Sequence, residues 1–125
     1  MELIQSPELP PPGGHYSQAV VTRSGLVFVS GVLPARDLFD ASFEGQCGSV
    51  FAQCEAILRA AGCGLDCVVQ CTAYLAGVEH WPAFDTAYAG VFGAHRPARA
   101  VVPVPALHYG FLVELQLVAE RPAAE

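Results

Sequence analysis

The sequence predicts an α+β fold in which a single mixed sheet carries two helices on one of its faces. Apolar residues recur at helical spacing in two segments, 46–61 and 81–92, and β-rich runs lie on either side of both. The element order is therefore β-β-α-β-α-β-β. Packing both helices on one face is the simplest arrangement, and the opposite face then needs a cover, which self-association would supply.

The N-terminal part of the chain predicts an extended lead-in followed by a β-hairpin. Residues 1–14 form the lead-in, because the three prolines and two glycines of Glu8–Gly14 prevent a regular helix. The β-rich runs 16–22 and 26–30 flank the turn Arg23-Ser24-Gly25. Two short strands joined by a glycine-containing turn are typical of a hairpin.

The middle of the chain predicts a helix followed by a strand. The helical spacing continues from Gln46 to Ala61, and Gly62 suits the left-handed residue that often follows a helix. Residues 67–75 are the strand. Alternation along that strand predicts a shared face for four small or apolar residues, Cys67, Val69, Cys71 and Ala73.

The last third of the chain predicts one helix and two strands. The helix begins near Trp81, with a proline tolerated in its first turn, and ends by Gly93. The strands are 99–104 and 111–118, and the tail is 120–125. Prolines at positions 103 and 105 indicate that the first of these strands is short or lies at an edge of the sheet.

Charge and length restrict the class of protein. The 125 residues correspond to one domain, 1–125, and carry a net charge of −6 without any basic cluster. This balance disfavours nucleic acid and anionic membrane surfaces as partners. All six basic residues are arginines, so Schiff-base chemistry on lysine and a P-loop lysine are excluded.

Cysteine usage and the N-terminus predict a cytoplasmic protein. Five cysteines, an odd number without a Cys-x-x-Cys pair, fit a reduced protein better than a disulfide scaffold. The four histidines are scattered, so no metal site is expected. The chain shows neither a signal peptide pattern nor an apolar run long enough to cross a membrane.

Two charged residues within apolar runs are the candidate functional groups. Arg99 heads the run 97–102, and a guanidinium in such surroundings offers a planar fork to a carboxylate. The alternative is a strand-end arginine whose stem covers apolar surface. Glu114 lies between Val113 and Leu115 and would position a water or pass a proton if it faces a cleft; otherwise it is an ordinary exposed strand residue.

Several segments resemble, in order and spacing, the YjgF/RidA family of imine and enamine deaminases. They are Gly14-His15-Tyr16-Ser17-Gln18-Ala19, Val27-Phe28-Val29-Ser30-Gly31, Ala60-Ala61-Gly62, Thr72-Ala73-Tyr74-Leu75, Arg96-Pro97-Ala98-Arg99 and Val113-Glu114. The resemblance implies a chorismate-mutase-like fold and a homotrimer with clefts at the subunit interfaces. It also implies hydrolysis of 2-imino or enamine acids to 2-oxo acids and ammonia, without a metal or organic cofactor.

The resemblance assigns expected roles by position. Arg99 matches the arginine that binds the substrate carboxylate, and Glu114 matches the glutamate that orients the attacking water. Tyr16 and Ser30 match residues that line the cleft, and the Tyr16 hydroxyl is expected to assist in orienting the water. Val101 matches a residue whose backbone N–H faces the substrate carboxylate.

Departures from the family pattern leave other functions open. Val32 stands at a usual glutamine, Asp85 at a frequent asparagine and Ala100 at a serine, while His15 and His108 replace prolines. Val32 and Asp85 are expected to contact the substrate, and the two histidines either line the cleft or lie on surface loops. The alternatives are a non-catalytic trimer that binds small carboxylates, and a hydrolase specialised for a bulkier imine.

Overall fold

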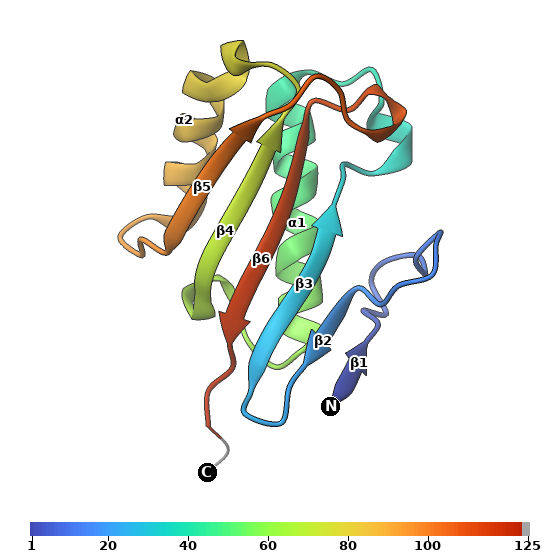
Figure 1. Cartoon of the computed structure of the whole chain (residues 1–125), viewed down its shortest axis with the longest axis vertical. Helices are drawn as coiled ribbons and strands as arrows, with labels where there is room; N and C mark the ends of the chain where they lie inside the picture. The colour runs from blue at the N-terminus through green and yellow to red at the C-terminus, as the bar shows by residue number, and fades with distance from the viewer. Residues whose placement is uncertain (124–125) are drawn as a thin grey trace.

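The structure, a computed structural model, describes residues 1–123, and in these residues six strands form one sheet in the order β1-β2-β3-β6-β4-β5 (Figure 1). The strands are β1 (Glu2–Ile4), β2 (Ala19–Val21), β3 (Leu26–Val32), β4 (Val68–Leu75), β5 (Ala98–Pro103) and β6 (Val113–Glu120). β5 runs parallel to β4, and the other neighbours are antiparallel. The sheet is therefore mixed, as the sequence predicts.

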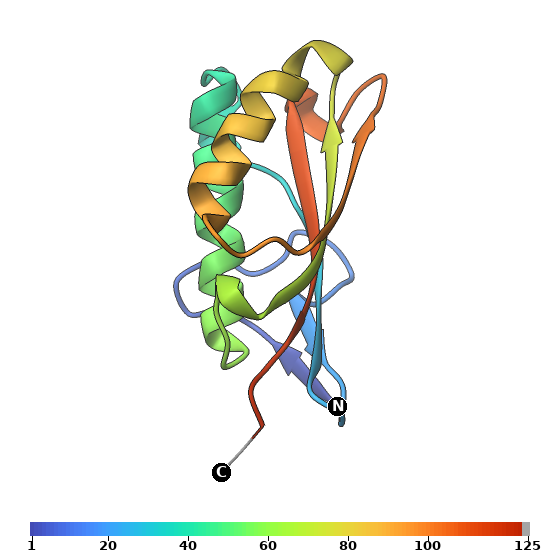
Figure 2. The same ribbon diagram turned by 90° about the vertical axis from the view of Figure 1, so that its left-hand side faces the viewer.

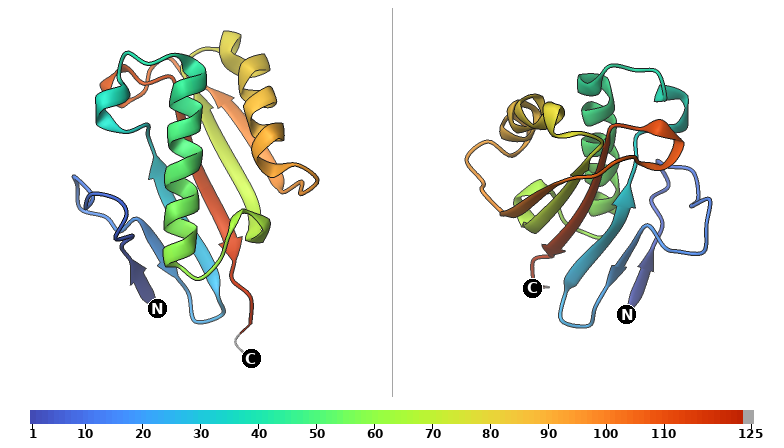
Figure 3. Two further views of the ribbon diagram at one scale, coloured as in Figure 1. Left: turned by 180° about the vertical axis from the view of Figure 1, so that it is seen from behind. Right: turned by 45° about the horizontal axis from the view of Figure 1, so that its top comes forward.

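Both helices lie on the same face of this sheet (Figure 2). They are α1 (Phe43–Ala60), which lies over β3 and β6, and α2 (Trp81–Phe92), which lies over β4 and β5 (Figure 3). The hydrophobic core fills the space between the two layers. Its largest fully buried apolar side chains are Phe84, Phe111, Leu58, Leu75, Leu115 and Leu117. The expected α+β fold class is confirmed.

The N-terminal lead-in contains a strand that the sequence analysis missed. β1 pairs antiparallel with β2, which makes the observed order β-β-β-α-β-α-β-β. The buried side chain of Gln18 holds the segment that follows β1. Its Oε1 accepts from the Ser6 N–H at 2.7 Å, and its Nε2 donates to the Pro10 carbonyl at 3.1 Å. A strand of three residues is too short to show an alternating pattern.

Capping fixes both ends of α1. The helix begins three residues earlier than predicted, because the Ser42 Oγ accepts a hydrogen bond from the Gly45 N–H at 3.1 Å. After the helix, Gly62 has a φ of 84°, in the left-handed region, as predicted. The next amide, that of Cys63, then donates back to the Leu58 carbonyl at 2.9 Å.

The predicted face of β4 is wrong at its beginning. A register shift against β6 between Val68 and Gln70 places Val68 in the core, 2% exposed, and leaves Val69 50% exposed. Cys67 lies before the strand, in a short 3-10 turn. Beyond this irregularity the alternation holds, and Cys71 and Ala73 are buried as expected. Strict alternation cannot anticipate a bulge.

The other face of the sheet has no cover in the single chain. Exposed apolar side chains on it include Leu3, Phe28, Val69 and Val102. β5 lies at the edge of the sheet, as its prolines indicated. β6 extends to Glu120, so only residues beyond it belong to the predicted tail 120–125, and the last two lie outside the described residues. Among the residues described, no helix is both long enough and apolar enough to cross a bilayer.

Gln46 provides a test of how the start of β6 is held. Its side chain is 2% exposed, accepts from the Leu112 N–H at 2.8 Å and donates to the Ala41 carbonyl at 3.1 Å. We expect Gln46→Leu to lower the free energy of unfolding by about 1–3 kcal/mol, because a buried N–H loses its acceptor. Ala52→Gln, on the exposed face of α1, should change it by less than about 0.5 kcal/mol. Urea unfolding checks both, and equal effects would contradict this role.

Candidate functional site

Arg99 is held at the edge of the sheet by two residues of α2. Its Nη1 donates to the Asp85 Oδ1 at 2.7 Å, and the guanidinium carbon lies 4.9 Å from the centroid of the Tyr88 ring. The Arg99 side chain is 29% exposed. The guanidinium is thus oriented by an ion pair and a cation–π contact while N–H groups remain open to solvent.

Tyr88 is a member of this site that the sequence analysis did not name, although it lies within the predicted helical segment 81–92. It is 8% exposed. Among residues 1–123, its hydroxyl is the one buried side-chain N or O atom without a hydrogen-bond partner. Burial raises the pKa of Tyr88 to about 12, so the ring stays neutral beneath the guanidinium. The sequence signal that places Tyr88 beside Asp85 is their spacing of three residues, since residues three apart share a helix face.

Val101 adds a backbone donor beside Arg99. The Val104 N–H donates to the Leu75 carbonyl at 2.8 Å, toward β4. Because backbone donors alternate in direction along a strand, the Val101 N–H points the other way, to the free edge of the sheet. Arg99, Val101, Asp85 and Tyr88 therefore form one group, which we call the edge cluster.

Glu114 lies elsewhere, near the start of β6. It pairs in register with Tyr74 of β4, on the face of the sheet that the helices leave open. Burial raises the pKa of Glu114 above its ordinary value of 4.5, and the charge of His108 opposes this shift. Gly31 leaves the space for this carboxylate, because a Cβ at that position would approach the Glu114 Oε2 to 2.5 Å.

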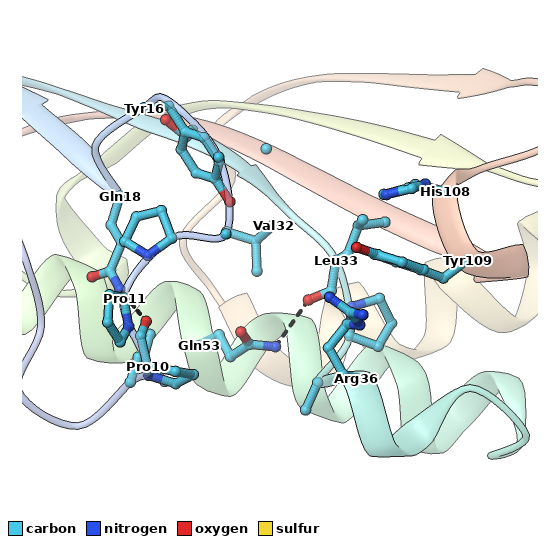
Figure 4. Close-up of a pocket in the computed structure, with 18 of the residues that line it drawn as sticks. Pro10, Pro11, Tyr16, Gln18, Val32, Leu33, Arg36, Gln53, His108 and Tyr109 are labelled. Carbon is cyan, nitrogen blue, oxygen red and sulfur yellow. Dashed lines mark hydrogen bonds between the residues drawn. The ribbon is translucent and has the colours of Figure 1, made fainter.

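Tyr16, Ser30 and Val32 surround the end of β3 next to Glu114. The Ser30 Oγ donates to the Ser17 carbonyl at 2.6 Å, which ties the loop carrying Tyr16 to β3. The three residues line one pocket of about 830 Å³, together with Gly31 and His108 (Figure 4). We call this pocket the groove.

The edge cluster and the groove cannot meet within one chain. Arg99 pairs in register with Cys71, whereas Glu114 pairs with Tyr74, three residues along the same strand. Side chains alternate along a strand, so Arg99 faces the helices and Glu114 faces the open side. β4 also separates their strands. A site that contains both residues therefore requires a second copy of the chain.

The geometry gives little support to catalysis by a cysteine thiol or to binding of a metal ion. Burial raises the pKa of the Cys71 thiol, and that of Cys47, to about 12, so neither forms a thiolate near neutral pH. Within residues 1–123, no three His, Cys, Asp or Glu side chains are grouped so that they could hold a metal ion. The candidate chemistry is that of an arginine anchor and a carboxylate.

The Asp85–Arg99 pair yields a prediction about anion binding. Asp85 occupies part of the arginine fork and competes with an incoming carboxylate; the pair is partly exposed, so it is worth up to about 1 kcal/mol. We expect Asp85→Asn to increase the affinity for pyruvate about twofold to fivefold in calorimetric titration. Asp66→Asn makes the same charge change on an exposed turn, and an equal gain there would show a general charge effect.

Known proteins resemble this chain over nearly its whole length. The family model described as Endoribonuclease L-PSP matches residues 7–121. Protein HMF1 of Saccharomyces cerevisiae is 33% identical over 113 residues, which cover 88% of this chain and 87% of HMF1. Protein DfrA of Myxococcus xanthus is 36% identical over 124 residues, covering 93% and 92%.

Solved structures agree with these sequence matches. Yeast Mmf1 superposes with a TM-score of 0.89 at 28% identity, covering 97% of this chain and 98% of its own. RidA from the Antarctic bacterium Psychrobacter sp. PAMC 21119 superposes with a TM-score of 0.87 at 30% identity, covering 96% and 99%. With a family model that spans residues 7–121 and the same fold in its relatives, the chain belongs to the YjgF/RidA family.

Proposed function

We propose that this protein hydrolyses 2-imino and enamine acids to 2-oxo acids and ammonia, in clefts shared by neighbouring copies of a homotrimer. The observation that carries the proposal is the separation of two complementary half-sites. The edge cluster offers a guanidinium and a backbone donor to a carboxylate, and Glu114, next to Gly31 at the mouth of the groove, offers a carboxylate that can orient a water. The uncovered sheet face supplies an apolar surface for the assembly.

The carboxylate of the substrate binds the edge cluster. The Arg99 guanidinium donates to it in the planar geometry that suits a carboxylate, and the Val101 N–H at the free strand edge adds a third donor. This anchor fixes the orientation of the C2 imine carbon against the second half-site. Positioning is a large part of the catalysis required, because it replaces a bimolecular encounter.

Glu114 of the neighbouring copy then orients the attacking water. The imine reacts in its protonated form, C=NH2+: the carboxylate accepts a proton from water as the new C2–O bond forms, and the electrons of the C=N π bond move to the nitrogen, which becomes a neutral amine. Glu114 returns this proton to the nitrogen of the carbinolamine. The C–N bond breaks, ammonia leaves, and the hydroxyl oxygen becomes the carbonyl of the 2-oxo acid as its proton is released. Water is the one co-reactant, and the Tyr16 hydroxyl helps to orient it.

Charge and thiol state support the rest of the proposal. The family description names an endoribonuclease, but a net charge of −6 without lysine opposes binding of a phosphate backbone. The five cysteines are free, which supports a reducing, cytoplasmic location. A trimer that binds small carboxylates without catalysis shares the anchor but would not accelerate hydrolysis, so the next experiment separates the two.

The first test compares hydrolysis of 2-iminopropionate, generated in situ from alanine, by wild type and by Arg99→Ala. Loss of a charge-assisted pair worth about 2–3 kcal/mol should lower kcat/KM roughly 30- to 150-fold. Arg23→Ala removes an equal charge from the exposed turn between β2 and β3 and should keep the wild-type rate. No acceleration by the wild-type trimer would reject the deaminase and leave the carboxylate-binding trimer.

Mixing two strongly impaired variants tests whether the site is shared between copies. Arg99→Ala and Glu114→Gln each lack one half-site, and unfolding and refolding them together at equal concentration gives mixed trimers. About a quarter of the interfaces then combine an intact Arg99 from one copy with an intact Glu114 from the next. We expect the mixture to regain about that fraction of wild-type activity, whereas sites within one chain would regain none.

The raised pKa of Glu114 predicts a pH dependence. Water orientation needs the carboxylate, so kcat/KM should fall as pH decreases through the Glu114 pKa, at a pH above the 4.5 of an ordinary glutamate. His108 lowers that pKa, so His108→Gln should move the acidic limb to higher pH. Glu114→Gln should remove the limb. An unmoved limb in both variants would show that another group controls it.

A further inference from the structure

The groove is much larger than the reaction proposed for its mouth requires. Beyond Tyr16, Ser30 and Gly31 it continues past Val32 to Gln53 of α1, with a total volume of about 830 Å³ (Figure 4). The side chain of 2-iminopropionate is a single methyl group. Pockets of this size normally bury most of a larger ligand.

The walls of the groove are apolar and aromatic. Val32 is 7% exposed and stands in the middle of the pocket, where the resemblance predicted a glutamine amide. Apart from the residues at its mouth, most of the side chains that line it are apolar, among them Leu9, Leu33, Ile57, Phe111 and the prolines at 10–12, and the polar ones are Gln18, Arg36, Asp37 and Gln53. Such a lining favours a large apolar side chain over a polar one.

Tyr109 forms a rigid aromatic wall at one side of the groove. In Figure 4 its ring lies between His108, with ring centroids 3.6 Å apart, and Arg36, whose guanidinium carbon is 3.9 Å from the Tyr109 centroid. Tyr109 has a φ of 61° and is the non-glycine residue of the described chain with a positive φ. A bulky residue keeps this unfavourable backbone conformation only where the surrounding structure holds it there, and such residues are frequent at ligand sites.

In the stack formed by His108, Tyr109 and Arg36, the guanidinium contributes a planar surface and is not engaged in an ion pair. Arg36 has no acidic partner within 4.0 Å among residues 1–123, so its guanidinium is free to lie flat on the tyrosine. Phe111 contacts the same ring edge-on, with centroids 6.1 Å apart. Planar guanidinium and aromatic groups arranged in this way provide a stacking surface for another planar group.

The groove is continuous with the reacting end of the site. Gly31 and His108 line it, and both also act on Glu114: Gly31 by leaving space for the carboxylate, and His108 by its charge. Glu114 itself lies outside the lining of the groove, so a substrate whose C2 atom lies at Glu114 would reach the groove past Gly31 and His108.

We propose that the groove binds the substrate side chain, and that the preferred substrates are 2-imino acids with an aromatic side chain. The inference rests on the proposed function for its reaction. The aromatic ring packs against Val32 and stacks on the outer face of the Arg36 guanidinium, which Tyr109 supports from its other side, while the carboxylate stays on the edge cluster. Val32 and Tyr109 are then the residues that determine specificity.

The test compares the imines generated in situ from alanine and phenylalanine, and the binding of the corresponding oxo acids, pyruvate and phenylpyruvate. We expect wild type to favour the phenyl compound by at least about tenfold in both kcat/KM and affinity. Tyr109→Gly suits the positive φ and so preserves the backbone; it should remove most of this preference, measured as the ratio of kcat/KM for the phenyl and the methyl imine. Tyr109→Phe should retain the preference, and Val32→Gln should reduce it.

The two readouts separate the outcomes. Hydrolysis of both imines at equal rates, with equal binding of both oxo acids, would overturn the groove inference and leave the deaminase intact. Preferential binding of phenylpyruvate without hydrolysis of either imine would support the groove and reject the reaction. Tyr109→Gly with an unchanged preference would overturn the assignment of the stack, provided that circular dichroism shows a folded protein.

Discussion

Alternation along β4 is the constraint on which the arrangement of this protein depends. One strand sets the directions of its two neighbours, so the register of Arg99 with Cys71 and of Glu114 with Tyr74 sends the two charged groups to opposite faces. No side-chain rotation brings them together across a packed sheet. The cation and the carboxylate are thus kept from neutralising each other within the chain, and each remains available to a ligand.

Buried amide side chains connect the sheet to the loops around the groove. Gln18 fastens the proline segment that forms one wall, and Gln46 holds the backbone just before β6, close to Tyr109 and Phe111. Each glutamine is nearly inaccessible to solvent and bonds to backbone rather than to other side chains. Hydrogen bonds of this kind fix loop backbones that an apolar core alone would leave adjustable.

Periodicity and turn chemistry predicted both helices and a β5 that is short or lies at an edge of the sheet, because these follow from local patterns. The bulge in β4 and the strand Glu2–Ile4 were beyond such patterns, since each depends on pairing with a distant strand. The same holds for the site. Arg99 and Glu114 were identified from the sequence, but their positions on opposite faces of the sheet depend on strand order. Tyr109 was identified only from its backbone conformation in the structure.

The two edges of the sheet limit how copies of this chain can meet. β1 has three residues and carries Glu2, which pairs with Arg121, and β5 ends in Pro103, which has no N–H to donate. A further strand would meet only three residues at β1, and along β5 it would find no N–H at Pro103, so neither edge offers a long uninterrupted row of donors and acceptors. Open-ended growth of the sheet into fibrils is therefore disfavoured, although exposed apolar side chains cover part of its face. In the proposed trimer the copies would meet through that face, where a closed assembly buries the surface and does not grow further.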